Sequence, residues 1–398
     1  MNLLELVKNL ESELIEIRRH LHRNPELSYE EYETAKFIQD KLRSYGIPFK
    51  SGIAGTGILG IIKGKDEGGV VALRADMDAL PIQEENDHDF ISKKKNIMHA
   101  CGHDAHMAML LGAGKILNQL RDRLQGTVLL VFQPAEEKTP VGGAKPMLEA
   151  GVFREIKPDV IYGQHVWPDL PAGQFGIRDR EMMGASDGFK ITIRGTGGHA
   201  SMPYKTNDPI VTAAYLITNL QTIVARSVDP LEAAVVTIGK IEGGSARNII
   251  GNQVTLEGTV RTYQPRIKEK VKERLFAIAN HTAEMYGNTV EVEYYDGYPA
   301  TINTPEWAKL ARSTAQKLFG EEATPDVDPV LAAEDFSRFL EEIPGAFIWL
   351  GTRLQDAEKQ RGLHDPRFDI NETALAKGTA FFVQLALDTL IELRKSKT

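Results

Sequence analysis

A nearly continuous apolar run at residues 127–132 restricts the fold of this chain more than any other feature. Strands of a parallel sheet that helices cover on both faces have such continuous apolar runs, whereas a half-exposed strand alternates apolar and polar residues. Shorter runs at 57–62, 70–73 and 159–163 predict further strands, and apolar periodicity predicts helices at 3–22, 30–45 and 105–117. We therefore expect an α/β domain with a layered sheet.

Polar residues follow three of these predicted strands. Asp76 and Asp78 come after the run at 70–73, Glu136 and Glu137 after 127–132, and His165 after 159–163. Open α/β sheets bind ligands beyond the carboxyl ends of their strands, so these side chains are expected at one edge of the sheet. Each has an ordinary alternative, namely turn chemistry for the aspartates, a solvated surface for the glutamates and a hydrogen-bonded core position for the histidine.

Residues 98–106, Met-His-Ala-Cys-Gly-His-Asp-Ala-His, hold the only cysteine and three of the ten histidines of the chain. Thiolate and imidazole are ligands for zinc and similar ions, and one glycine between Cys101 and His103 lets both side chains reach one point. Asp104 is expected to serve two purposes, to cap the following helix and to orient a ligating imidazole. The alternative is a buried structural cysteine beside a helix.

The order of the predicted strands and helices changes at about residue 184. Predicted strands and helices then follow the order βαββαβ, at 189–194, 209–226, 233–241, 253–261, 268–286 and 289–294. This order is the split ferredoxin-like unit. From about residue 298 the α/β pattern returns, with helices at 305–319, near 334–335 and at 372–394, a strand at 347–350 and His364 in a loop. We predict a discontinuous domain, 1–183 with 298–398, and an inserted domain, 184–297, in keeping with a length of 398 residues.

The composition of the chain restricts its possible classes of binding partner and its cellular compartment. The formal charge is −8, with 55 acidic and 47 basic residues, which argues against nucleic acid or an anionic membrane as a partner. A single cysteine cannot form an internal disulfide, and the amphipathic, acidic first residues do not read as a signal peptide. No window approaches 18 uninterrupted apolar residues. We expect a cytoplasmic protein.

Six segments together resemble a known family. They are residues 20–28 (HLHRNPELS), 74–81 (RADMDALP), 98–104 (MHACGHD), 133–137 (QPAEE), 198–200 (GHA) and 334–337 (EDFS). Over nearly its whole length the chain resembles the dinuclear metal-dependent aminoacylases and carboxypeptidases, which include hippurate hydrolases, auxin-conjugate hydrolases and N-acyl-amino-acid amidohydrolases. The Cys-Gly-His-Asp segment is similar to the amidohydrolase branch.

The resemblance implies a function for each matching position. It implies two divalent metal ions per subunit, zinc first and manganese, cobalt or nickel otherwise, with a bridging cysteine and the ligands Cys101, His103, Glu137, His165 and His364. Glu136 would be the general base, and Asp76 and Asp78 would support the site. His199, Asn248 and Arg261 of the inserted domain would contact the substrate, and that domain would act as a lid and form a homodimer or larger oligomer.

The expected reaction is hydrolysis of the amide bond of N-acyl amino acids or of short peptides at their carboxyl end. A metal-activated water would attack the carbonyl, with a glutamate as the base. One alternative is an amidase that uses Cys101 as its nucleophile. That mechanism would give no common function to the glutamates and to His165 and His364. The other is a metal- or peptide-binding protein without turnover.

Overall fold

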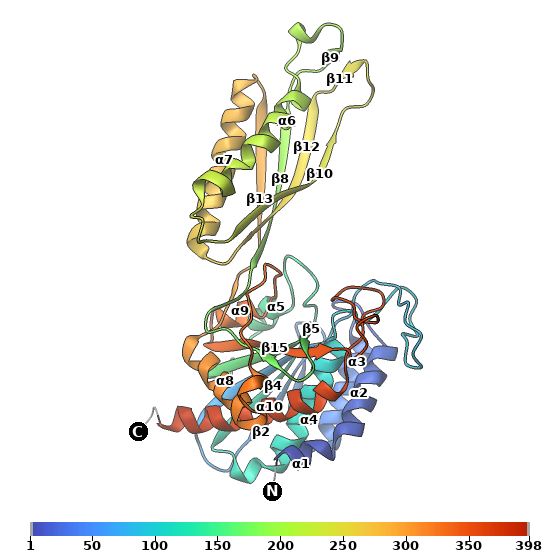
Figure 1. The fold of residues 1–398 in the computed structure, drawn as a ribbon, viewed down its shortest axis with the longest axis vertical. Helices are drawn as coiled ribbons and strands as arrows, with labels where there is room; N and C mark the ends of the chain where they lie inside the picture. Colours follow the sequence, from blue (N-terminus) through green and yellow to red (C-terminus); the bar gives the residue numbers. More distant parts are fainter. Residues whose placement is uncertain (1–2, 396–398) are drawn as a thin grey trace. The chain divides into compact units, whose positions relative to one another are not determined.

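The computed structural model describes residues 3–395, which form two compact units (Figure 1). The first unit comprises the chain up to Met182, Ile302–Asp328 and the residues from Asp335 onward; the second comprises Met183–Thr301 and Pro329–Glu334. The predicted boundaries, 183/184 and 297/298, therefore differ by a few residues, and the segment 329–334 was not expected in the second unit. It belongs there because the Gly184 amide donates to the carbonyl oxygens of Val330 and Ala332, at 2.9 Å each.

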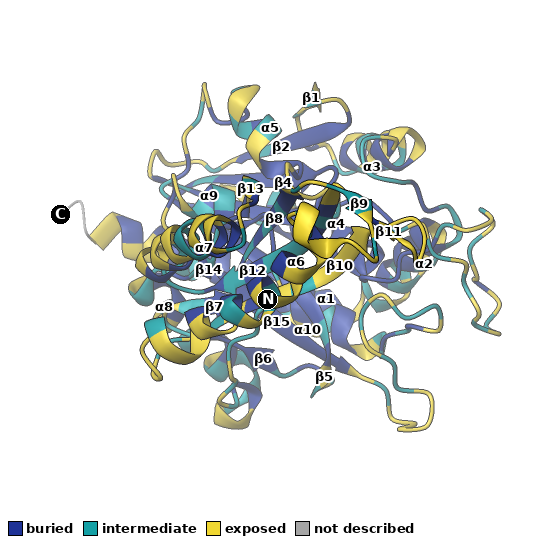
Figure 2. Cartoon of the chain, turned by 90° about the horizontal axis from the view of Figure 1, so that it is seen from above, coloured by how far each residue is buried: buried dark blue, intermediate teal, exposed yellow. Residues whose placement is uncertain are grey.

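A seven-stranded mixed sheet forms the centre of the first unit. Its strands, in spatial order, are β1 (Phe49–Ile53), β2 (Gly57–Lys63), β4 (Gly126–Gln133), β3 (Gly69–Asp76), β5 (Val160–Pro171), β15 (Gly345–Arg353) and β6 (Phe175–Gly176). The central pairs β4–β3, β3–β5 and β5–β15 are parallel, and the outer pairs are antiparallel. The expected mixed-sheet α/β fold is confirmed, and the central strands are almost wholly buried (Figure 2).

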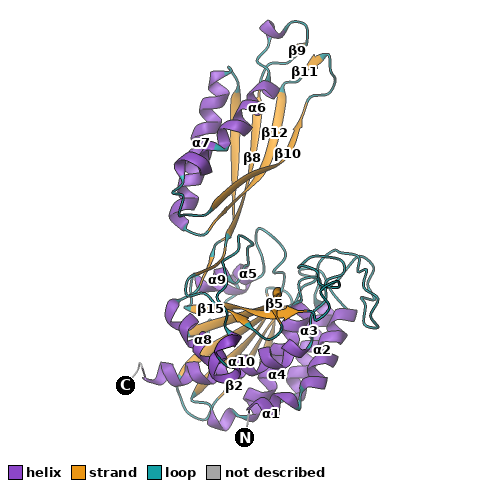
Figure 3. Ribbon diagram, viewed as in Figure 1, coloured by secondary structure: helices purple, strands orange, loops and turns teal. Residues whose placement is uncertain are grey.

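Helices cover this sheet. They are α1 (Leu3–Lys8), α2 (Glu11–Arg23), α3 (Tyr32–Ser44), α4 (His103–Gln119), α5 (Ala144–Glu149), α8 (Pro305–Phe319), α9 (Ser337–Leu340) and α10 (Thr373–Lys395). Helices α4 and α10 contact each other and β3, and Figure 3 shows α1, α2, α4 and α10 gathered on one side of the sheet. By length and composition α10 could cross a bilayer, but 67% of its most apolar window is buried, so the core accounts for its apolar face.

The first unit differs from the local predictions at three places. The N-terminal helix is interrupted at Asn9 and Leu10, which separates α1 from α2. Strand β1 was not predicted because its middle residues are exposed at the edge of the sheet and give no apolar run. Strand β5 does not end near His165 but continues to Pro171, because β15 pairs alongside it and places Trp349 opposite His165.

The second unit has the expected βαββαβ order, β8 (Ala185–Arg194), α6 (Pro209–Leu220), β10 (Ala234–Gly243), β12 (Gln253–Thr262), α7 (Pro265–Met285) and β13 (Thr289–Tyr298). The antiparallel sheet has the order β10–β12–β8–β13, and α6 and α7 pack on it around Phe189, Leu216 and Leu275. The helix predicted to reach Arg226 ends at Leu220 and is followed by a short π-helix, Ile223–Ser227. Short strands complete the chain as two pairs, β9 (Gly198–His199) with β11 (Ile249–Ile250), and β7 (Glu181–Met183) with β14 (Thr301–Ile302).

Candidate metal centre

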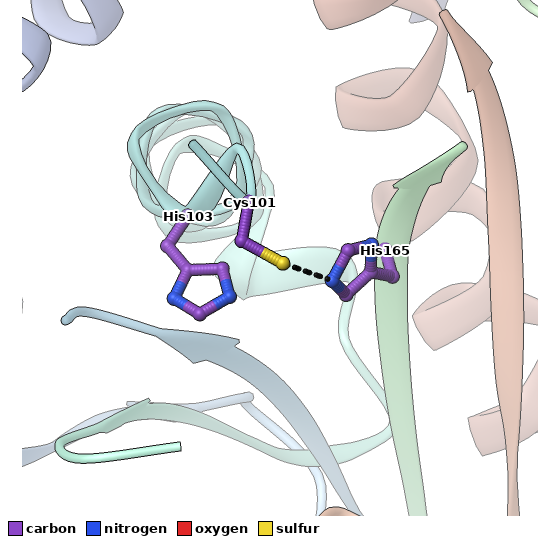
Figure 4. Close-up of side chains that lie close together, drawn as sticks. All are labelled: Cys101, His103 and His165. Atoms are coloured by element: carbon purple, nitrogen blue, oxygen red, sulfur yellow. Dashed lines mark hydrogen bonds between the residues drawn. The ribbon is translucent and has the colours of Figure 1, made fainter. Parts of the chain in front are cut away.

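The turn into α4 places two of the predicted ligands. Gly102 is the N-cap of α4 and has a φ of 81°, a left-handed conformation that glycine adopts without steric cost. Cys101 and His103 lie on either side of it, and Cys101 Sγ is 3.4 Å from His165 Nε2 on β5 (Figure 4). The thiol and both imidazoles therefore lie close together.

The turn after β4 carries both glutamates. The two carboxylate oxygens of Asp78, just beyond β3, accept hydrogen bonds from the backbone amides of Glu136 and Glu137 at 3.0 Å each. Since β3 and β4 are parallel neighbours, their carboxyl ends meet at the same edge of the sheet. Asp78 thus fixes the backbone from which both glutamates project.

The loop that follows β15 brings in His364. Its backbone amide donates to the Ala100 carbonyl at 2.8 Å, and its Nε2 lies 3.2 Å from Glu137 Oε1. His364 has a φ of 66°, which is uncommon for a residue with a side chain. The backbone bond to Ala100 holds His364 beside Cys101 although the two are far apart in sequence.

Backbone carbonyls fix which nitrogen of two imidazoles is free to bind a metal. His103 Nδ1 lies 2.8 Å from the Asp78 carbonyl oxygen, and His165 Nδ1 lies 2.7 Å from that of Val166. A carbonyl only accepts, so both Nδ1 atoms carry a proton, and Nε2 is the atom of each ring that can bind a metal. Such bonds are the usual support of ligating histidines.

The five predicted ligands lie in overlapping groups, within each of which the donor atoms are no more than 4.8 Å apart. These groups are Cys101 with His103 and His165, Cys101 with Glu137 and His364, and His103 with both glutamates. Among residues 3–395, buried His103 Nε2 has no hydrogen-bond partner, and Glu137 Oε1 has only the 3.2 Å contact with His364 Nε2. Sulfur, nitrogen and carboxylate donors around such a buried nitrogen fit a divalent ion such as zinc.

The electrostatics favour a cation at this point. Burial, together with Glu137 and Glu136, raises the pKa of the Cys101 thiol well above its usual value. Burial alone would lower the pKa of His103, but Asp76 and Asp78 outweigh it and raise that pKa to about 10. Burial and the neighbouring His106 hold the pKa of His165 well below its usual value. A metal that binds here has to displace the protons of Cys101 and His103.

His106 supports the centre, a role that the sequence analysis did not assign. Its Nδ1 lies 2.6 Å from Asp76 Oδ1, and its Nε2 accepts a hydrogen bond from the Val166 amide at 2.9 Å. It thereby links the end of β3 to β5 next to His165. The available signal was its spacing of three residues from His103, which puts both side chains on one face of α4.

The prediction that Asp104 caps α4 was wrong. Gly102 occupies the cap position, and the Asp104 carboxylate instead accepts hydrogen bonds from Arg18 Nε at 3.0 Å and His22 Nδ1 at 2.8 Å. The buried Arg18 guanidinium attracts the carboxylate toward α2. The two residues that Asp104 contacts are not among the five predicted ligands.

The second unit holds the other three predicted site residues in two places. His199 on β9 pairs with Ile249 on β11, so Asn248 is its close neighbour, and the Ala200 amide donates to the Asn248 carbonyl at 3.2 Å. Arg261 lies near the opposite end of β12 from Gln253, the end next to β11. Eight residues at about 3.3 Å each separate Gln253 from Arg261, so Arg261 lies roughly 26 Å from the end of β12 nearest His199.

Residues 72–388 match the model of peptidase family M20/M25/M40, and the chain belongs to this family. It is 40% identical to thermostable carboxypeptidase 2 of Saccharolobus solfataricus, over 97% of this chain and 99% of that protein. It is 42% identical to the N-acetyl-L-cysteine deacetylase of Bacillus subtilis, over 98% and 91%. A crystal structure of a dinuclear metal-binding M20 peptidase from Bacillus subtilis is 36% identical, with a TM-score of 0.85 over 96% of this chain and 99% of that one.

These similarities confirm the resemblance to the aminoacylase and carboxypeptidase family and the α/β fold with a separate inserted domain. They also confirm the enzyme class, a metal-dependent hydrolase of amide bonds with the dinuclear metal site of its family. A binding protein without turnover is therefore set aside.

Proposed function

We propose that the chain hydrolyses N-acyl amino acids and the carboxyl-terminal bond of short or N-blocked peptides at two ions held by Cys101, His103, Glu137, His165 and His364. One observation carries this proposal. The donor atoms form two groups that share Cys101 Sγ, one with His103 and His165 and one with Glu137 and His364. With such an arrangement Cys101 would help to hold both ions.

Two divalent ions, zinc by donor type and manganese, cobalt or nickel otherwise, would acidify a water molecule and polarise the carbonyl. Glu136 is suited to be the proton carrier because it is only 7% exposed and projects from a backbone that Asp78 fixes. One of its oxygens, Oε1, accepts a hydrogen bond from the Asp335 amide at 3.3 Å. In this proposal Glu136 takes the proton from water and delivers it to the leaving amine.

His199 has the tautomer that an oxyanion donor needs. The Ser201 backbone amide, which only donates, lies 3.2 Å from His199 Nδ1. In the neutral ring the proton is then on Nε2, which can donate to the developing oxyanion. Arg261 is assigned to the carboxylate of the amino-acid part of the substrate, because a guanidinium binds a carboxylate through paired charge-assisted hydrogen bonds.

The distance between His199 and Arg261 supports a dimer. About 26 Å along β12 is too far for one inserted domain to bring both residues to one small substrate. We therefore propose a homodimer in which one of the two comes from the partner subunit. The exposed apolar side chains of Ile210, Val211 and Tyr215 on α6 offer a face for that contact, whereas Ala213 and Leu220 of the same helix are buried in the core.

A substrate and metal panel tests the proposed function. The protein would be stripped with a chelator, reloaded with zinc, manganese, cobalt or nickel, and assayed on N-acetyl and N-benzoyl amino acids and on short blocked peptides. We expect no hydrolysis without metal and recovery on reloading.

Full activity of the metal-free protein would instead support Cys101 as a nucleophile. That reaction is disfavoured because burial raises the pKa of the Cys101 thiol and lowers that of His165, opposite to the shifts an activated cysteine needs.

A reducing compartment such as the cytoplasm is proposed because the single thiol has to stay unoxidised to bind metal.

A further inference from the structure

A second cluster of metal-binding side chains lies in the first unit and shares no residue with the proposed dinuclear centre. His22 comes from the last turn of α2, and Glu84 and His88 come from the loop between β3 and α4. Their ligand atoms lie within 4.8 Å of one another. His22 Nε2 is 3.1 Å and His88 Nε2 is 3.4 Å from the same oxygen, Glu84 Oε1.

A carboxylate stands behind one of these imidazoles. Asp104 Oδ2 lies 2.8 Å from His22 Nδ1, on the side of the ring away from Glu84, and Arg18 Nε donates to the same oxygen at 3.0 Å. The Asp104 carboxylate is paired with the buried Arg18 guanidinium and therefore accepts from His22 Nδ1, which leaves His22 Nε2 facing Glu84. A carboxylate, a histidine and a metal in this order are the common support of a metal site.

Nitrogens without a hydrogen bond lie near the same point. Within the described chain His88 Nδ1 and both nitrogens of the buried His99 have no hydrogen-bond partner, and His88 Nε2 has only the 3.4 Å contact with Glu84 Oε1. His88 stacks on Phe90 with ring centroids 3.6 Å apart, which fixes its ring, and the His99 ring lies 6.5 Å from that of His22. Buried polar atoms are almost always paired, so such a group calls for a bound species.

We infer that His22, Glu84 and His88 bind one further divalent cation of the zinc type, separate from the dinuclear centre. Two imidazoles and a carboxylate are a common ligand set for zinc, with water at the open position. The ion would join α2 to the loop of residues 77–102, which has no helix or strand between β3 and α4 and ends next to Cys101. Irregular loops of this length are uncommon in compact domains, and metal binding adds to folding stability, so the ion would stabilise the segment that presents the thiol.

Metal counting tests this inference. Wild type, His88→Ala and Glu84→Gln would be reloaded with zinc, freed of excess by gel filtration, and analysed by mass spectrometry for metal per chain. We expect wild type to hold one ion per chain more than either variant. His281→Ala is the matched control, because His281 is an exposed histidine on α7, and it should bind as wild type does.

Activity assays of the same variants distinguish this site from the dinuclear one. His88→Ala and Glu84→Gln should lose the further ion and still hydrolyse N-acyl amino acids. Equal metal in wild type, His88→Ala and Glu84→Gln would overturn the inference. Cobalt titration of the unmodified protein gives a test without variants. Cobalt bound at Cys101 has a thiolate charge-transfer band, so uptake should continue after that band saturates. If uptake stops with the band, the site is a proton-bridged network and the inference fails.

Discussion

Replacement of Gly102 by alanine tests how the neighbouring ligands are positioned. Its φ of 81° costs an L-residue about 1–2 kcal/mol. A Cβ there would lie 2.4 Å from Val166 Cγ2, an overlap that typically costs about 1–3 kcal/mol. Together the unfolding free energy of the first unit should fall by about 2–5 kcal/mol. Since Cys101 and His103 flank the residue, relief of the overlap displaces a ligand, and metal affinity should fall too.

Two further variants distinguish the cost of the backbone conformation from the cost of the steric overlap. Gly55 has a φ of 100°, and a Cβ there would meet no heavy atom of the described chain within 4 Å beyond its immediate neighbours, so Gly55→Ala measures the backbone cost alone. Adding Val166→Ala to Gly102→Ala removes the overlapping methyl group, and the two changes should couple favourably in a double-mutant cycle. Urea unfolding and metal content are the assays. If Gly102→Ala costs no more than Gly55→Ala and retains its metal, the reasoning is refuted.

Glu136→Gln should retain its metal and lose about 100-fold or more in kcat, and activity within tenfold of wild type would contradict its role as the base. Cys101→Ser should weaken zinc binding more than manganese binding, since a hydroxyl is a harder ligand, and equal losses by calorimetry would argue against Cys101 as a ligand. Mixed, exchanging Glu136→Gln and His199→Ala dimers should recover about a quarter of wild-type activity, whereas no recovery despite proven exchange would place His199 in its own subunit's site. Arg18→Met should cost about 3–5 kcal/mol because it strands a buried carboxylate, and Arg43→Met, on the surface, less than about 1 kcal/mol, by urea unfolding.

Strands that are buried on both faces were predictable because their apolar runs leave few alternatives. The run at 127–132 became β4, and the polar residues after it lie at the expected edge of the sheet. Strand β1 was missed because an exposed edge strand has no such run. The pairing of β5 with β15 is a long-range contact, so the extension of β5 past His165 could not be read from local sequence.

The support of the site was harder to predict than its ligands. Cys101 and His103 are separated by one residue and belong to rare residue types, so the sequence shows them as a pair. The bond of His106 to Asp76 and that of Arg18 to Asp104 join separate elements, and nothing near either residue in the sequence indicates its partner. Burial decides such pairs, because a charged group enters the core only beside its counter-charge.

The order of the elements along the chain has a consequence for biosynthesis. The second unit consists mainly of one contiguous stretch, Met183–Thr301, which has its own core and can fold as soon as it leaves the ribosome. The sheet of the first unit has to wait for β15, and the site for His364, both made after that stretch. At roughly 5–20 residues per second the remaining chain takes about 5–20 s to synthesise. During that interval the buried faces of β3, β4 and β5 lack α10, which makes the nascent first half a natural client for chaperones.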